Sequence, residues 1–474
     1  MCCLALVLLV VPTVRAEAEE AAVYTFTINY DVQNTGSYTA HNVKARIFLF
    51  DNLMTEWADQ QVMSESITVD GRAVSHNNLT IYEEDDNRWA EVSLGNMDSG
   101  ESKTISVVQT IKVTSVRFSI NPSSVGTSIS SDLLQYTQPV ASLWESDDSS
   151  ISALATSLTE NTTNLYYKAR QIFDWVVENL TYEKQTAEHD ALWMFQNKKG
   201  DCSDFSNLYI ALARAAGIPA KAVSGNAYSS LYALTGSQTD INVVGHAWIL
   251  IYLPDYGWVP ADGVWPLGQG SFGDVDYSHI VGATTGGTEV VKSSGVVWPG
   301  PGVIREFWSY YTGQSTQVDA TSSGNVIPEV MLDVSVQASS QISDGVLPFT
   351  VTVKNMSRNQ ADNVSLTLGL NSTYFEPVDV QSKSSLASNE QWVASFDVTL
   401  KDNAYGQSHD IQATATYASE YTGITGQLAA VGSRTVSVAA KPASPVVSQD
   451  LMIYVLLGVV AAAVVGVVAV VARR

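Results

Sequence analysis

Apolar and polar residues alternate along two long stretches of this 474-residue chain, one near each end. In the first stretch, one face carries five apolar side chains, namely Tyr24, Phe26, Ile28, Tyr30 and Val32. Turn residues 34–36 lead into a second alternating run, and another follows Gly100. Period-two runs between turn signals are typical of antiparallel sheets packed face to face. We therefore predict an N-terminal β-sandwich over residues 17–138.

The second stretch, from Val346 to Ala440, repeats the style of the first. Its segment 349–351 leads through a polar loop to Asn363-Val364, as segment 26–28 leads to Asn42-Val43. It resembles the immunoglobulin-like (Ig-like) modules of archaeal and bacterial surface proteins. We predict a related Ig-like sandwich over residues 329–440, joined to the middle of the chain by a connector over residues 291–328.

The middle of the chain changes to helical spacing of its apolar residues. Those that recur every three or four positions are Leu165, Ala169, Ile172, Phe173, Val176 and Leu180, with Thr162 and Thr163 available as caps. A second predicted helix follows Cys202 and stops at Gly217. Three strands are expected after it, at Ala220–Gly225, His246–Leu253 and Trp258–Ala261. Helices followed by strands predict an α+β domain over residues 139–290.

Cys202 stands where a loop enters the second predicted helix. The unpaired N–H groups and the dipole of a helix N-terminus favour a thiolate there, and the same N–H groups can hold an oxyanion. A lone cysteine is often only a small buried hydrophobe, but a structural one more often lies on the apolar face within a helix. Its position therefore favours a nucleophile.

His246 opens a predicted strand, and the chain turns at residues 254–257 before it reaches Asp262. The midpoint of 246 and 262 falls inside that turn, so an antiparallel return brings Asp262 across from His246. A carboxylate in that position fixes the tautomer of an imidazole and stabilises its protonated form. Taken alone, each of these residues has an ordinary structural interpretation.

Two segments together, GDCSDFSNLYIALARAAGIPAKAVSGNAY and GHAWILIYLPDYGWVPAD, resemble the transglutaminase-like superfamily, in particular its membrane-anchored cysteine peptidase-type members in archaea and bacteria. The resemblance covers roughly residues 160–270 and implies a papain/transglutaminase-like fold. It also implies that Cys202 is the nucleophile, His246 the general base and acid, and Asp262 the orienting carboxylate. The chain departs from the family after Asp262, where Gly263-Val264-Trp265 follows instead of the common Pro-Thr.

Other polar and aromatic residues near these segments receive lesser roles. Asp204 matches the family motif and is expected to cap the helix or brace the loop. Tyr182 or Trp193 could supply a donor to an oxyanion, although both are equally compatible with a core position. His189 is interpreted as a surface histidine, and His279 has no partner that the sequence can identify.

The two ends of the chain suggest export and a membrane anchor. An apolar run before Ala16 predicts a signal peptide over residues 1–16, although it lacks a basic residue at its start. Residues 451–472 carry no charge and precede Arg473-Arg474, which predicts a transmembrane helix with its basic end in the cytoplasm. We expect a single-pass type I protein of the cell membrane, with a short stalk over residues 441–450 and an extracellular ectodomain.

Composition narrows the possible partners. The 25 basic and 48 acidic residues give a net charge of −23, which disfavours a nucleic-acid partner. Cys2, Cys3 and Cys202 are the cysteines, so removal of a signal peptide leaves one and no internal disulfide. Six glycosylation sequons agree with secretion, at Asn78, Asn161, Asn179, Asn355, Asn363 and Asn371.

Competing chemistry finds little support in the sequence. The chain has no Gly-rich phosphate loop and no His-x-x-x-His pair, so we predict no cofactor and no metal. The acidic run 83–86 is better explained as a solvated turn than as a calcium site. We expect a cell-surface thiol enzyme that acts on protein or peptide amides, as a peptidase, an amidase or a transglutaminase. The alternative is a non-catalytic envelope or adhesion protein that uses the same fold as a scaffold.

Overall fold

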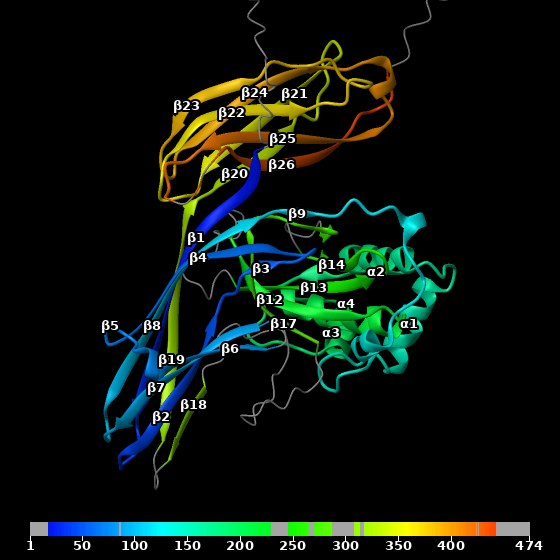
Figure 1. Cartoon of the computed structure of the whole chain (residues 1–474). Helices are drawn as coiled ribbons and strands as arrows, with labels where there is room; N and C mark the ends of the chain where they lie inside the picture. Colours follow the sequence, from blue (N-terminus) through cyan, green and yellow to red (C-terminus); the bar gives the residue numbers. More distant parts are fainter. Residues whose placement is uncertain are drawn as a thin grey trace, which may run out of the picture.

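The computed structural model describes residues 18–84, 87–228, 245–264, 270–286, 308–312, 317–422, 424 and 426–441. The predicted signal peptide, the predicted membrane helix and all but the first residue of the predicted stalk lie outside these ranges. Within them, no helix combines the length and the apolar character that a membrane crossing needs. The described chain forms two β-sandwiches and an α+β domain beside the first of them (Figure 1).

The N-terminal sandwich consists of two facing sheets. One contains β1 Glu19–Asn34, β8 Ser102–Thr114, β4 Asp59–Val69, β19 Val318–Val330 and the short strands β3 Leu53–Met54 and β5 Arg72–Ala73. The other contains β18 Trp308–Thr312, β2 Ala40–Leu49, β7 Asn87–Met97 and β6 Leu79–Glu84, which follows the 3-10 turn η1 His76–Asn78. The alternating residues predicted to face inward, such as Phe26, Ile47 and Val107, are buried in its core.

The predicted connector over residues 291–328 is wrong where the structure describes it. Residues 308–312 pair with β2, and residues 318–330 form a long antiparallel strand along β1. Among the strands that the structure describes, β19 pairs with β1 alone, and it exposes much of its surface, so the sequence hides this strand. Its first half, VDATSSG, therefore lacks the apolar alternation that marked the other strands.

The C-terminal sandwich also has two sheets. The first contains β20 Leu332–Ala338, β21 Val346–Asn355 and β24 Gln391–Thr399. The second contains β22 Ala361–Gly369, β23 Gln381–Leu386, β25 Ser408–Ala418 and β26 Leu428–Ser437, with the 3-10 turn η5 Asp402–Ala404 before β25. β19 runs almost directly into β20, and the start of β1 pairs with β26, so continuous backbone joins the two sandwiches (Figure 1).

The two sandwiches share a buried asparagine corner, which supports the predicted kinship between them. In the first, the Asn34 side chain donates to the carbonyls of Tyr38 at 2.8 Å and Met97 at 2.9 Å. In the second, the Asn355 side chain donates to Asn359 at 2.9 Å and Leu386 at 2.8 Å.

The backbones of the two corners correspond as well. Gly100 N donates to Asn34 O at 2.8 Å, and Asn389 N donates to Asn355 O at 3.0 Å. Residues 100 and 389 both adopt positive φ, at 79° and 63°. The same corner therefore closes both sandwiches.

The corner corrects one glycosylation prediction. Asn355 is fully buried, and both of its described side-chain donor contacts are to backbone carbonyls. Its amide is therefore inaccessible in the folded protein. The other five sequon asparagines lie on the surface, and their glycosylation stays a prediction.

Where the structure describes it, the α+β domain packs four helices against a five-stranded sheet. The helices are α1 Ser149–Thr159, α2 Leu165–Asn179, α3 Ala191–Asn197 and α4 Cys202–Ala215, and the sheet order is β15 Ser271–Phe272, β14 Gly257–Asp262, β13 Gly245–Leu253, β12 Ala220–Ala227 and β17 His279–Thr285. α4 is almost wholly buried and packs on β12 and β13. The cap of α2 is Asn164 rather than the predicted Thr162 or Thr163. The 3-10 turns η2 Pro122–Ser124 and η3 Ser131–Thr137 precede this domain.

The N-terminal sandwich docks on the edge of this sheet at β17. The Gln60 side chain donates to Val281 O at 3.0 Å and accepts from Val281 N at 2.9 Å. Asn87 makes the same double contact with the backbone of Thr284, at 3.0 and 2.8 Å. A small apolar cluster that includes Trp57 and Trp248 fills the space beside them. The short strands β9 Val116–Arg117 and β16 Asp274–Val275 pair across the same junction.

Candidate active site

Cys202 is the first residue of α4, as the sequence predicts. Asp201 is the N-cap, and its carboxylate accepts from the backbone N–H of Ser203 at 3.1 Å. Asp204 closes the capping box, because its Oδ2 accepts from Asp201 N at 3.0 Å. The expected structural role of Asp204 is therefore confirmed. The thiol is partly exposed at the positive end of the helix dipole.

Gly200 explains how this loop can hold the cysteine so close to buried side chains. A Cβ at this position would lie 2.5 Å from Asp204 Oδ2 and 2.9 Å from the Met194 sulfur. The residue is paired in a two-residue parallel ladder, β11 Lys199–Gly200 against β10 Thr181–Tyr182. The ladder places Tyr182 beside Gly200, two residues before the thiol.

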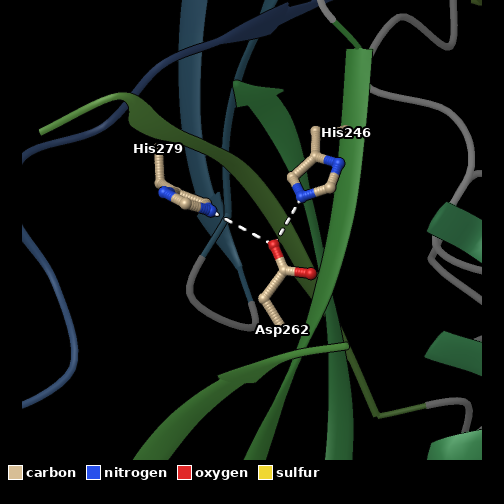
Figure 2. Close-up of side chains that lie close together, drawn as sticks. All are labelled: His246, Asp262 and His279. Atoms are coloured by element: carbon tan, nitrogen blue, oxygen red, sulfur yellow. Dashed lines mark hydrogen bonds and ion pairs between the residues drawn. The ribbon is translucent and has the colours of Figure 1, made fainter. Parts of the chain in front are cut away.

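His246 and Asp262 lie on the adjacent antiparallel strands β13 and β14 (Figure 2). The pairing is centred on residue 255 rather than 254, because Leu253 pairs with Gly257 and Ile249 with Ala261, so the partner of each residue differs by two positions from the prediction. Extended by one residue, this register sets Asp262 opposite Trp248, so His246 is its diagonal neighbour on the same face. The two side chains meet nevertheless, with His246 Nε2 2.6 Å from Asp262 Oδ2.

Three contacts with described residues hold the Asp262 carboxylate. Its Oδ2 faces His246 Nε2 at 2.6 Å and His279 Nε2 at 3.2 Å, and its Oδ1 accepts from the backbone N–H of Val264 at 2.8 Å. Burial raises the pKa of this carboxyl, but the charges and hydrogen bonds of the two histidines outweigh burial and hold the pKa well below its usual range. Residues 262–264, where the sequence departs from the family pattern, form a local turn in which the Val264 N–H fixes the carboxylate.

His246 interacts with Asp262 on one side and with Cys202 on the other. Burial lowers its pKa, but the charge and hydrogen bond of Asp262, followed by a hydrogen bond and the charge of Cys202, raise the pKa from 6.5 to about 9. Because Nε2 faces Asp262, Nδ1 is the ring nitrogen left to face the sulfur. The thiol therefore lies beside an imidazole that is protonated at neutral pH.

His279 is a residue of the candidate site that the sequence did not predict. It opens β17, is buried, and contacts Asp262 from a different side than His246 does (Figure 2). Its Nδ1 lies 2.9 Å from Asp276 Oδ1. Burial lowers the pKa of His279, but hydrogen bonds to Asp262 and Asp276 and the charges of both raise the pKa from 6.5 to about 9. An aspartate three residues before a histidine that opens a buried strand was the available signal.

Trp248 packs against both histidines. Its ring is stacked on His246 with centroids 5.8 Å apart, and it meets His279 edge-on at 5.1 Å. Gly225 leaves room for this ring, because a Cβ there would lie 2.7 Å from the indole and 2.1 Å from the Ile280 carbonyl. The aromatic packing fixes the orientation of both imidazoles.

The two candidate oxyanion donors differ in their surroundings. Burial, followed by the charges of Cys202, Asp201 and Asp262, raises the pKa of Tyr182, which therefore stays protonated beside the thiol. Trp193 instead stacks on His189 with ring centroids 3.7 Å apart. His189 is half-buried and lies 3.3 Å from Asp204, so the prediction of a surface histidine is only partly correct.

His246, Asp262 and His279 also have the composition of a metal-binding group, with ligand atoms within 4.8 Å of one another. Both imidazoles, however, lie within hydrogen-bonding distance of the same carboxylate oxygen, Asp262 Oδ2. Hydrogen bonds between a carboxylate and two protonated rings therefore account for the arrangement, and the rings need no metal to be satisfied.

Comparison with known proteins supports the identity of this region. Residues 152–263 match the sequence profile of the Transglutaminase-like superfamily. A segment covering 23% of the chain is 29% identical to 16% of the uncharacterized protein YebA of Bacillus subtilis. The chain is also 32% identical, over 21% of its length, to 32% of an uncharacterized protein of Haemophilus influenzae. The chain thus spans less than two thirds of both relatives.

Among solved structures, a candidate cysteine protease from Cytophaga hutchinsonii is similar to 65% of the chain over 98% of its own length. Its sequence identity is 18% and the TM-score is 0.39.

Proposed function

Because residues 152–263 form a domain of the transglutaminase-like superfamily, we propose that the chain is a thiol enzyme that transfers the acyl group of an amide. One observation carries the proposal. Cys202, at the start of α4, interacts with a buried His246 whose far nitrogen lies 2.6 Å from Asp262. This is the arrangement that nucleophilic catalysis by cysteine requires.

In the proposed reaction, the Cys202 thiolate attacks the carbonyl carbon of the amide. The carbonyl oxygen becomes an oxyanion, for which we propose the backbone N–H of Cys202 and the hydroxyl of Tyr182 as donors. His246 then gives its Nδ1 proton to the leaving nitrogen as the C–N bond breaks, and a thioester remains on the sulfur. Asp262 fixes the ring and stabilises the imidazolium, but it transfers no proton.

The thioester is then passed to an acceptor. Water gives one proton to His246 as it attacks, the C–S bond breaks, and a carboxylic acid product and the thiolate result. A primary amine that attacks in the same way gives a new amide. We propose hydrolysis of protein or peptide amides as the main reaction, with amine transfer as the variant outcome, since both share every residue of the site.

We place this reaction outside the cell as part of the same proposal. The charge-free segment 451–472 with Arg473-Arg474 behind it, and the five surface sequons, support an exported protein held by one membrane helix. Truncation after Ser448 is expected to release the protein into the soluble fraction. Retention on the membrane would contradict this part of the proposal.

The competing function is a non-catalytic scaffold, and a substitution separates the two. We expect the full-length protein to release amine from a mixture of unstructured peptides, and Cys202→Ser to reduce the rate by at least ~10⁴-fold with an unchanged melting temperature. A labelled primary amine added to the same assay distinguishes transfer from hydrolysis. Equal rates for the wild type and the variant would favour the scaffold.

A further inference from the structure

His279 is flanked by carboxylates at both ring nitrogens. Nε2 lies 3.2 Å from Asp262 Oδ2, and Nδ1 lies 2.9 Å from Asp276 Oδ1. Ionised carboxylates only accept hydrogen bonds, so both ring nitrogens must donate, and only the protonated imidazole can do that. The side chain is 2% exposed, so water does not replace either partner.

We propose that His279 is a positioning residue of the active site, which clamps the same oxygen of the Asp262 carboxylate that His246 contacts, from a different direction, and limits the proton affinity of His246. This inference rests on the proposed function, because it assigns a role within the same reaction. In this scheme we assign His279 no contact with the thiol or the substrate. It acts only through Asp262.

The clamp has a geometric part. A carboxylate held only by His246 could rotate about its own bond and carry the imidazole with it. With His279 on Oδ2 and the Val264 N–H on Oδ1, that rotation would break two hydrogen bonds at 3.2 and 2.8 Å. Asp276 anchors His279 in turn, and its own Oδ1 also accepts from Ser278 N at 2.9 Å. The turn at residues 276–278 therefore holds His279 in place, and through His279 it holds Asp262.

The clamp also has an electrostatic part. Two protonated rings share one carboxylate, and their centroids are 5.6 Å apart. The charge on His279 therefore opposes a second charge on His246 and offsets part of the stabilisation that Asp262 gives. A less tightly held proton on His246 passes more readily to the leaving nitrogen.

The titratable groups around His279 come from several elements. Asp262 and His246 face it from β14 and β13, and Asp276 faces it from its own turn. Asp59 of the N-terminal sandwich lines the small cavity beside it. Arg117 and Tyr24 lie close enough to Asp276 to feel its charge.

The test replaces His279 by Gln in the full-length protein, since the Gln amide can still donate to Asp262 but carries no charge. The readout is the rate of Cys202 alkylation by iodoacetamide against pH, measured by peptide mass spectrometry. The upper inflection of this profile reports loss of the His246 proton and needs no turnover. We expect it to move up by about one pH unit in His279→Gln. His409→Gln, which removes a buried histidine of the C-terminal sandwich, should leave it in place.

An inflection that stays in place or moves down in His279→Gln overturns the proposal. If His279→Gln does not fold, Asp276→Asn serves as the test. Removal of the Asp276 carboxylate lowers the proton affinity of His279 and so reduces its average positive charge. It should move the inflection up by a smaller amount, and no movement overturns the proposal. Where turnover is measurable, His279→Gln should lower kcat about 10-fold at constant KM. An upward inflection without any turnover would support the clamp and contradict only the proposed function.

Discussion

The two β-sandwiches are built on the same asparagine corner but stand in different relations to the active site. The N-terminal one seals the outer edge of the sheet of the α+β domain, where Gln60 and Asn87 satisfy the backbone of β17. The C-terminal one reaches that region mainly through the start of β20, where Leu332 O accepts from the Tyr277 hydroxyl at 2.9 Å. The two sandwiches have similar folds but therefore make different contacts with the α+β domain.

What decides the difference is the strand edge. β17 is the last strand of its sheet, and an uncovered edge leaves backbone donors and acceptors without partners. The side-chain amides of Gln60 and Asn87 mimic a neighbouring strand there. Since His279 opens β17, the N-terminal sandwich helps to place a residue of the candidate active site.

The comparison predicts different consequences for two matched amide truncations. Gln60→Ala leaves the N–H and the carbonyl of Val281 unpaired, which should cost about 2–4 kcal/mol of stability in the docked pair of domains. It should also lower kcat/KM about 10-fold, because β17 shifts. Asn355→Ala should destabilise the C-terminal sandwich by a similar amount and leave kcat/KM unchanged. Thermal unfolding and peptide hydrolysis measure the two effects, and equal losses of activity would contradict the comparison.

Alkaline pH should destabilise the α+β domain but not the C-terminal sandwich, by a smaller amount than the two truncations do. The pKa values of His246 and His279 are raised from 6.5 to about 9, so their contribution to stability is complete below about 6.5 and is lost as the pH rises towards 9. Asp262, with its lowered pKa, contributes above its unfolded value of 3.8 and loses that contribution only in stronger acid.

We therefore expect hydrogen-exchange protection factors of β13, β14 and β17 to fall between pH 6.5 and 9. Those of β21 and β24 in the C-terminal sandwich should stay constant. The asparagine corner at Asn355 provides an internal reference in the same molecule. A uniform decline of the protection factors in all five strands would show that the histidines do not cause the loss of stability at alkaline pH.

Local signals made most of the site predictable from the sequence. Cys202 lies at a loop-to-helix boundary, and His246 and Asp262 flank one tight turn, so neighbouring residues alone bring the last two together. The two-residue error in register came from the turn, which centres on Asp255 with φ 70° and Gly257 with φ 79°. It did not matter, because diagonal neighbours on one face still meet.

The features that escaped prediction depend on distant pairings. His279 reaches Asp262 only after β17 has paired with β12 on the far side of β13. β19 likewise becomes a strand by pairing with β1, almost 300 residues earlier in the chain, and its own pattern is too polar to announce it. No local pattern encodes these long-range strand pairings, although Asp276 three residues before His279 gives a local hint that this histidine is held in place.

The central claim is that Cys202 and His246 form a reactive ion pair, and one measurement tests it most directly. A thiol of ordinary pKa near 8.5 is almost entirely protonated at pH 6, whereas an ion-paired one is largely thiolate. Even with its weaker intrinsic nucleophilicity, Cys202 should react with iodoacetamide at least ~10-fold faster than glutathione at pH 6. His246→Ala should abolish that excess without unfolding the domain. A wild-type rate no faster than that of glutathione, or one that His246→Ala leaves unchanged, would contradict the account.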